Sequence, residues 1–381
     1  MDFKVESPLR EHVVENAAAV TTTQDPTPKT EPDPKRQRLE TPDPEGVIIL
    51  DADGDLRLCV GADHSWEPLT FLVCSKSLSR SSPVMKQLIL DELAGLPSLQ
   101  SGQSNRAIHL PNDPLGPMRL MLEIIHGDFQ KVPQTMEIKD LEALVVLMER
   151  YDALSLARPW VRAWLAGVRD SKEYTILLFI AWTLGDIELF STTTSRLAEI
   201  STIDQNGKLI IKTRNDSETY WNFAVQEIGP LLPASVIERM AIERTQWISA
   251  TVGPYIRLYN ELKRGNCECR FASRHALKTM SPRCRALAIG SLVHGFLDMD
   301  INITTPNPTS EYRDTFASLV DRIDKLEILT DHNCDTYNHD ECARMQEVMK
   351  HKRIVNKPLT YVEPYYRKRI ESQAKKTGLS S

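Results

Sequence analysis

The alternation of apolar and polar positions is clearest in the segment that begins at Leu69. Leu69, Phe71 and Val73 alternate with two other residues, and in a strand successive side chains point to opposite faces. Three apolar side chains therefore share one face, which predicts a short strand that is buried on that side.

Two short helices are predicted directly after this strand. Ser75 is placed to cap the first helix and Ser82 the second, and Pro83 stands at the first helical position, where its missing N–H costs nothing. The apolar residues that follow at helical spacing are Val84, Met85, Leu88 and Ile89. The segment is thus expected to fold as one strand–helix–helix unit.

The flanking segments predict further strands. Residues 47–50 and 56–60 are strand-like, and Asp53-Gly54 between them favours a tight turn, because both residues tolerate positive φ. We expect these two strands to pair as a hairpin. Residues 107–110 predict a third short strand in these flanks.

Three helices are then expected, over residues 117–125, 139–151 and 154–165. The first two carry apolar stripes at helical spacing. The third carries Trp160 and Trp164 four residues apart, which we assign to the core rather than to a ligand stack, because aromatic residues at this spacing are usually buried.

This order of elements resembles the heart of a BTB/POZ domain. The residues at the matching places of the BTB pattern are Phe71, Lys76, Leu78, Ser82 and Met85. Ser75 stands where a His is usual, and Met85 stands where a Phe is usual. Tyr151-Asp152 and Pro159-Trp160 are similar to pairs in the large fungal set of BTB/POZ proteins. The resemblance covers about residues 47–166.

The resemblance implies a small sheet capped by helices that serves as an oligomerisation and adaptor module, with homodimers as the expected assembly. The residues to which it assigns partner contacts are Phe71, Ser75, Leu78, Val84 and Met85. The family often provides substrate adaptors for cullin-type ubiquitin ligases. The segments that correspond to its cullin contacts are Pro83–Ile89 and Val161–Leu184.

The rest of the chain predicts a mainly helical domain over residues 167–355. Ile176–Leu184 is apolar on every side, which indicates a buried helix, and Asn206-Gly207 between apolar flanks predicts a hairpin. Further helices are expected at 233–263 (one long helix, or two broken near Gly253-Pro254), 282–296, 316–326 and Glu341–Ile354. The fold class expected is α+β, with a BTB/POZ domain followed by a mainly α-helical C-terminal domain.

The two ends differ in charge. Residues 1–46 hold six Lys/Arg and ten Asp/Glu, a net charge of −4, with many prolines, so we expect a disordered acidic tail. Lys35, Arg36 and Arg38 form a short basic cluster in it, which is either a nuclear import signal or solvated charge. The predicted location is accordingly the nucleus, the cytoplasm or both.

The C-terminal end is basic. Residues 343–381 hold ten Lys/Arg and three Asp/Glu, a net charge of +7, and we expect residues 356–381 to be a flexible tail. An alternative function follows from Arg367-Lys368-Arg369 and Lys375-Lys376, which could bind phosphates in a chromatin- or DNA-associated transcriptional regulator. Proteins rather than nucleic acid are nevertheless the partners expected first.

Seven cysteines, an odd number, favour reduced thiols over a disulfide framework. Those in the helical half fall into two groups, at residues 267–284 and 334–342, and two histidines lie in or next to the second. The residues proposed as ligands of a structural zinc ion are Cys267, Cys269, Cys334, His339 and Cys342, with Cys284 and His332 as substitutes. Free thiols and ordinary histidines are the alternative, and no other cofactor is expected.

No catalytic motif accompanies these features. The chain lacks a phosphate-binding glycine loop, a zinc-protease motif and a nucleophile elbow, so we do not expect an enzyme, although a catalytic C-terminal half is the alternative. No run of about 18 apolar residues occurs, so a membrane span is not expected either.

Overall fold

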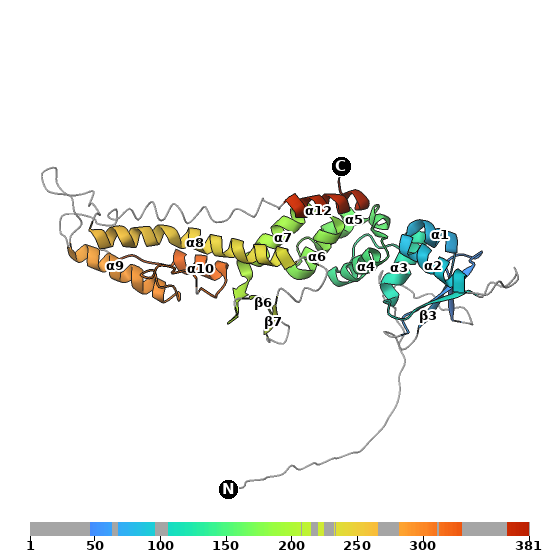
Figure 1. The fold of residues 1–381 in the computed structure, drawn as a ribbon, viewed down its shortest axis with the longest axis horizontal. Helices are drawn as coiled ribbons and strands as arrows, with labels where there is room; N and C mark the ends of the chain where they lie inside the picture. Colours follow the sequence, from blue (N-terminus) through green and yellow to red (C-terminus); the bar gives the residue numbers. More distant parts are fainter. Residues whose placement is uncertain are drawn as a thin grey trace, which may run out of the picture. The chain divides into compact units, whose positions relative to one another are not determined.

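The structure is a computed structural model that describes residues 46–62, 68–95, 106–206, 208–214, 220–224, 232, 234–265, 282–310, 312–329 and 364–380. The strands are β1 (Val47–Ile49), β2 (Leu56–Val60), β3 (Leu69–Val73), β4 (Ala107–Leu110), β5 (Thr202–Ile203), β6 (Leu209–Arg214) and β7 (Tyr220–Ala224). Strands and helices occur together (Figure 1), which confirms the α+β fold class.

The helices of the N-terminal half are α1 (Ser75–Ser81), α2 (Pro83–Gly95), α3 (Leu115–His126), α4 (Ile138–Arg150) and α5 (Val161–Val168), with 3-10 turns η1 (Phe129–Lys131) and η2 (Leu154–Ala157). Those of the C-terminal half are α6 (Tyr174–Leu184), α7 (Ile187–Ile200), α8 (Ala234–Arg264), α9 (Pro282–Leu297), α10 (Phe316–Asp324) and α12 (Pro364–Thr377). The helix expected over 154–165 is therefore a 3-10 turn followed by α5.

The first sheet has the order β1-β3-β2-β4. β3 runs parallel to β1 and antiparallel to β2, and β4 runs parallel to β2. The turn at Asp53-Gly54 is present, since the Gly54 N–H donates to the Asp51 carbonyl at 3.0 Å. The expected β1–β2 hairpin is wrong, however, because β3 lies between the two strands. Phe71 and Val73 of β3 are fully buried, which places this strand in the interior of the sheet.

The two predicted helix caps have different outcomes. Ser82 caps α2, since its Oγ accepts a hydrogen bond from the Met85 N–H at 2.9 Å. Ser75 does not cap α1. Its own N–H and Oγ–H both donate to the Asp55 carboxylate at 2.7 Å, so an acid from another segment supplies the acceptor. Burial raises the pKa of Asp55, but the hydrogen bonds from Ser75 outweigh this effect and lower it below its ordinary value.

Predictions for the C-terminal half are confirmed at several elements. Leu177–Leu184 of α6 is buried along its whole length. β5 and β6 pair antiparallel, with Ile203 opposite Leu209, as expected on either side of Asn206-Gly207, although Gly207 itself lies outside the described residues. Residues 234–264 form one continuous helix that includes Pro254. Among the described residues, no helix is long and apolar enough to cross a bilayer.

Buried apolar residues form two clusters, which we call the front core and the rear core. The front core is formed by residues between Leu56 and Met240, joined by Tyr366 and Ile370. The rear core is formed by residues between Ile248 and Ile323. We expected a domain boundary near residue 166, but the front core continues through α5, α6 and α7, and the clusters divide within α8 (Figure 1).

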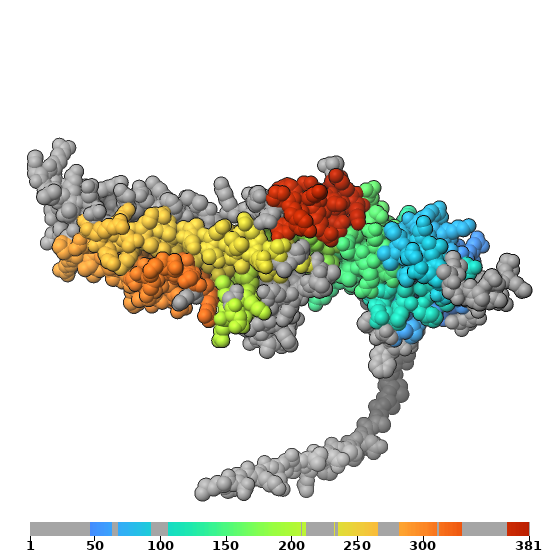
Figure 2. Space-filling view, viewed as in Figure 1, coloured from blue at the N-terminus to red at the C-terminus, as the bar shows by residue number. Residues whose placement is uncertain are grey.

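The C-terminal segment differs from the flexible tail that we expected over 356–381. Pro364–Thr377 is a helix, α12, whose buried residues are Tyr366, Ile370, Gln373, Ala374 and Thr377. This helix packs on α6 and η2, and its surface adjoins that of α5–α7 in Figure 2. The high content of Lys and Arg concealed an apolar stripe at i, i+4 and i+8, which is enough to bury one face of a helix.

Candidate protein-interaction site

Three of the five residues assigned to partner contacts lie inside the protein. Phe71, Leu78 and Met85 are fully buried in the front core, whereas Ser75 and Val84 are half-buried. This placement corrects the expectation, because a side chain without exposed surface cannot contact a partner in this conformation. Apolar residues at fixed strand and helix spacing specify the core first.

The surface of the same half exposes other large apolar side chains. Ile49 on β1 is 51% exposed, Leu90 on α2 is 47% exposed, and Phe129 in η1 is 58% exposed. The Phe129 ring lies against Trp160, with 5.6 Å between centroids. Such side chains are the usual anchors of protein interfaces, where a few residues provide most of the binding energy.

A small pocket lies beside α4. It is lined by Pro114, Glu142, Ala143, Val146, Leu147 and Arg150 and has a volume of about 240 Å³. The middle of the pocket is apolar. Glu142 and Arg150 place a carboxylate and a guanidinium at its opposite ends along α4. Burial and the nearby charge of Glu173 raise the pKa of Glu142, an effect that Lys139 partly opposes.

A network of hydrogen bonds holds the Arg150 end of this pocket. Arg150 Nη1 donates to Asp113 Oδ1 at 2.6 Å, and the Tyr151 hydroxyl donates to the other oxygen of the same carboxylate. Ser82 Oγ donates to the Tyr151 carbonyl at 2.6 Å, which joins α2 to the end of α4. Burial and the bond to Asp113 raise the pKa of Tyr151, so its hydroxyl stays a donor.

Helix α12 is fixed to the front core by charged and polar contacts. Arg369 pairs with Glu149 at 3.2 Å, and Lys376 pairs with Asp152 at 2.9 Å. Arg158 donates to the carbonyls of Lys375 and Lys376, which are among the last acceptors of the helix. These contacts join the middle and the C-terminal end of α12 to residues near the end of α4 and just after η2.

Gly185 lets α12 come this close. It follows α6 with φ of +92°, and a Cβ built on it would overlap the backbone nitrogen of Ala374. Only a residue without a side chain fits there. The C-terminal segment of Val161–Leu184, predicted to contact a cullin, is α6, which is buried under this arrangement. In this structure the accessible parts of that prediction are the exposed faces of α2 and α5.

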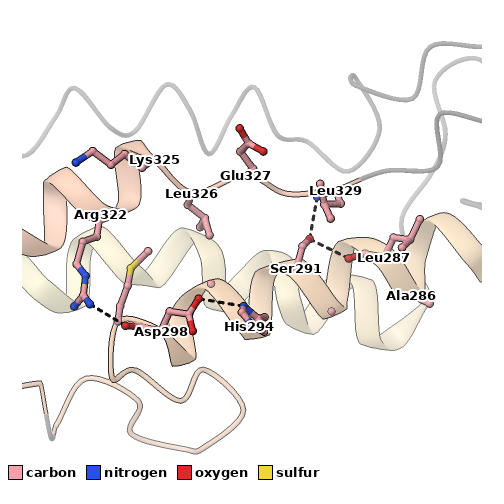
Figure 3. Close-up of a pocket in the computed structure, with 13 residues that line it drawn as sticks. Ala286, Leu287, Ser291, His294, Asp298, Arg322, Lys325, Leu326, Glu327 and Leu329 are labelled. Atoms are coloured by element: carbon pink, nitrogen blue, oxygen red, sulfur yellow. Dashed lines mark hydrogen bonds and ion pairs between the residues drawn. The ribbon is translucent and has the colours of Figure 1, made fainter.

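A larger hollow than the α4 pocket is a groove in the rear half, shown in Figure 3. It has a volume of about 690 Å³. Residues 286–299 of α9 and its C-terminal turn form one side, and residues 322–329 form the other. The segment after α10 runs back along α9, since Leu326 lies against Gly295 and the Leu329 N–H donates to Ser291 Oγ at 2.9 Å.

Ser291, His294 and Asp298 line this groove, but they do not form a nucleophile–base arrangement. His294 Nδ1 lies 3.1 Å from Asp298 Oδ2, with the two side chains 78% and 66% exposed. The Ser291 hydroxyl donates to the Leu287 carbonyl at 2.9 Å, so its proton is directed along the helix (Figure 3). A catalytic serine instead needs a base within hydrogen-bonding reach of its hydroxyl. In this structure these three side chains therefore line a surface groove without forming a catalytic arrangement.

Several predicted site residues lie outside the described part of the chain. These are the import cluster Lys35, Arg36 and Arg38, the zinc ligands Cys267, Cys269, Cys334, His339 and Cys342, the substitute His332, and the helix Glu341–Ile354. The other substitute, Cys284, is fully buried in α9, so it is not placed to join a loop site. Within the described ranges, no group of three or more His, Cys, Asp or Glu residues could hold a metal ion.

No family model matches this chain, and no curated protein matches it. The arguments about function therefore depend on the sequence and on this geometry. The α4 pocket and the docked α12 were not predicted from the sequence. The apolar stripe Tyr366, Ile370 and Ala374 could have predicted that one face of α12 is buried. The pocket could not be predicted in this way, because it depends on how α3 packs against α4.

Proposed function

We propose that this chain is a non-catalytic protein-interaction module that forms homo-oligomers through a BTB/POZ-like N-terminal half and acts as an adaptor or scaffold. The observation that carries the proposal is the small mixed sheet β1-β3-β2-β4 with its attached helices, whose outer surface exposes Ile49, Leu90 and Phe129. Exposed anchors on a rigid, well-packed support are what a protein interface needs.

The test is the mass of the full chain in solution. Light scattering at tens of micromolar, roughly the range of weak transient contacts, should give at least a dimer. A monomer at every concentration would reject self-association. An adaptor for a cullin-type ubiquitin ligase is the specific role proposed, and co-purification with a cullin N-terminal domain in low salt tests it separately.

The alternative, a chromatin- or DNA-associated regulator, is supported less well. It needs the basic residues near the C-terminus to be available for phosphates. Arg369 and Lys376 are instead paired with Glu149 and Asp152, while Arg367 and Lys368 are exposed. If the alternative is correct, affinity for DNA will fall steeply with added salt.

We also propose that part of the protein resides in the nucleus, through Lys35, Arg36 and Arg38. Replacing these three residues with Ala in a fluorescent fusion should move it to the cytoplasm. An unchanged distribution would assign the cluster to solvated charge.

The structural zinc site is kept as a proposal about the rear half. Leu326 lies against Gly295 of α9, and Leu329 is hydrogen-bonded to Ser291, one turn nearer the start of the helix. Residues 326–329 therefore run antiparallel to α9, towards its first residue, Pro282. Pro282 is the first described residue that follows the segment with Cys267 and Cys269 in the sequence. Elemental analysis of protein purified without chelator should give about one zinc per chain, and less than about half an equivalent would leave free thiols.

A further inference from the structure

The pocket beside α4 has the size and lining of a socket for one side chain. Its volume of about 240 Å³ is below the roughly 300–1,000 Å³ of small-molecule sites. Ala143, Val146 and Leu147 supply its apolar middle. Pockets of this kind at protein interfaces receive a single apolar anchor from the partner.

The charges around the socket restrict which anchor fits. Glu142, Val146 and Arg150 are successively four residues apart, so each step is about 6 Å along one face of α4. An anchor seated over Val146 would thus have a carboxylate one turn to one side and a guanidinium one turn to the other. A partner with a cation one turn before its anchor complements the Glu142 end of this face. The Arg150 end is already paired with Asp113 at 2.6 Å.

The chain itself carries such a segment on α2. Leu90 is 47% exposed, and Lys86 lies one turn before it on the same face. Asp91 follows Leu90, and its carboxylate accepts a hydrogen bond from Gln87 Nε2 at 2.7 Å, which fixes the acid beside the anchor. The spacing of Lys86 and Leu90 on α2 therefore matches that of Glu142 and Val146 on α4, while Asp91 lies about 100° round the helix from Leu90.

We propose that a second copy of this chain inserts Leu90 into the α4 pocket, with its Lys86 beside Glu142. The inference rests on the proposed self-association and specifies its contact. Each copy carries one anchor and one socket. The contact therefore joins the anchor of one copy to the socket of another, because the two are different patches of the surface.

The other exposed apolar side chains of this half match the socket less well. Ile49 is flanked by Ile48 and Leu50, so no charge accompanies it. Phe129 lies against Trp160, and its neighbours Asp128 and Lys131 are paired with each other at 3.0 Å. Leu90 alone among these three combines an exposed apolar side chain with a cation one turn before it on the same helix face.

Complementation between two variants of the full chain tests the contact. Leu90→Asp removes the anchor and keeps the socket, and Val146→Asp does the reverse. Sedimentation velocity at tens of micromolar, the range of weak contacts, should show each variant associating at least about tenfold more weakly than wild type. An equimolar mixture should associate again, because one anchor and one socket are intact. Leu297→Asp, which charges an equally exposed leucine on α9, is the control and should not change association.

Charge reversal gives a second test that leaves the apolar lining of the pocket unchanged. It tests the Leu90 contact even if Val146→Asp lowers the melting temperature of the chain. Lys86→Glu and Glu142→Lys should each weaken association about two- to fivefold, and the chain with both changes should return to wild-type affinity.

The outcomes separate this inference from the proposed function. If wild type associates and Leu90→Asp associates equally well, the Leu90 contact is wrong while self-association stands. If the mixture of Leu90→Asp and Val146→Asp stays monomeric although both fold, the pairing is also wrong. If wild type itself is a monomer throughout, both the inference and the proposed self-association are rejected.

Discussion

The front and rear cores share one helix but are closed in different ways. The front core surrounds a four-stranded sheet, and α12 returns from the end of the chain to cover α6. The rear core consists of the second half of α8 with α9, α10 and the segments between and after them, and a groove of about 690 Å³ runs along α9. The front core is covered by a segment far away in the sequence, α12, whereas the rear core is formed by helices that follow one another in the sequence. We infer that the rear core is the less stable of the two.

The largest expected effect concerns the rear core. Phe296 is fully buried there, and its ring contacts Tyr255 with 5.2 Å between centroids. Phe296→Ala should lower the free energy of unfolding by about 3–5 kcal/mol, because it leaves a cavity. Hydrogen exchange should show lost protection in α9 and α10 while α4 and α6 keep theirs. Equal loss in all four helices would mean that the two cores unfold as one unit.

This difference between the cores also explains what the sequence could predict. The elements around Leu69–Ile89 and the buried α6 follow from local periodicity, which needs only neighbouring residues. The pairing of β3 with β1, and the docking of α12, depend on contacts between distant segments. A turn at Asp53-Gly54 shows that the chain reverses but not which strands pair. The candidate site was predicted least well, because Phe71, Leu78 and Met85 match a family pattern that specifies the core.

The second prediction tests how α12 closes the front core. Gly185→Ala would place a Cβ against Ala374 and should release α12 from α6. Gly127→Ala is the matched control, because Gly127 also follows a helix at positive φ but has open space around it. The control should cost only the backbone strain, about 1–2 kcal/mol, and Gly185→Ala should cost more. Limited proteolysis should cut α12 in Gly185→Ala alone; equal resistance in both variants would contradict the close approach.

The third prediction concerns the junction of the two cores. Arg244 lies on α8 between them and is fully buried, and it donates to the carbonyls of Ser201, Tyr312 and Asp314. Arg244→Met should destabilise the chain by about 1–3 kcal/mol, because buried carbonyls lose their donor. Thermal unfolding measures this, with the exposed Arg257→Met on the same helix as control. A loss no larger than that of the control would show that the cores join without this residue.

The smallest expected effect depends on pH and concerns the front half alone. Asp55 accepts hydrogen bonds from the Ser75 N–H and Oγ–H at 2.7 Å, and its pKa lies below the ordinary value of 3.8. A carboxylate with a lowered pKa in the folded state adds stability above its unfolded pKa. That contribution is lost as the pH falls through the folded pKa, when the carboxylate takes up a proton. The rear core should not share this dependence.

Asp55→Asn should therefore lower stability slightly near pH 7, by less than about 1 kcal/mol, because the exposed site is screened by water. As the pH falls below the ordinary value of 3.8, the carboxylate of the unfolded chain takes up a proton before the folded one does, so the difference between variant and wild type should shrink. Urea unfolding at several pH values measures both effects, and Asp53→Asn in the same loop is the control, since Ser75 donates to Asp55 and not to Asp53. A difference that stays constant from pH 7 to pH 3 would show that the charge of Asp55 does not hold the start of α1.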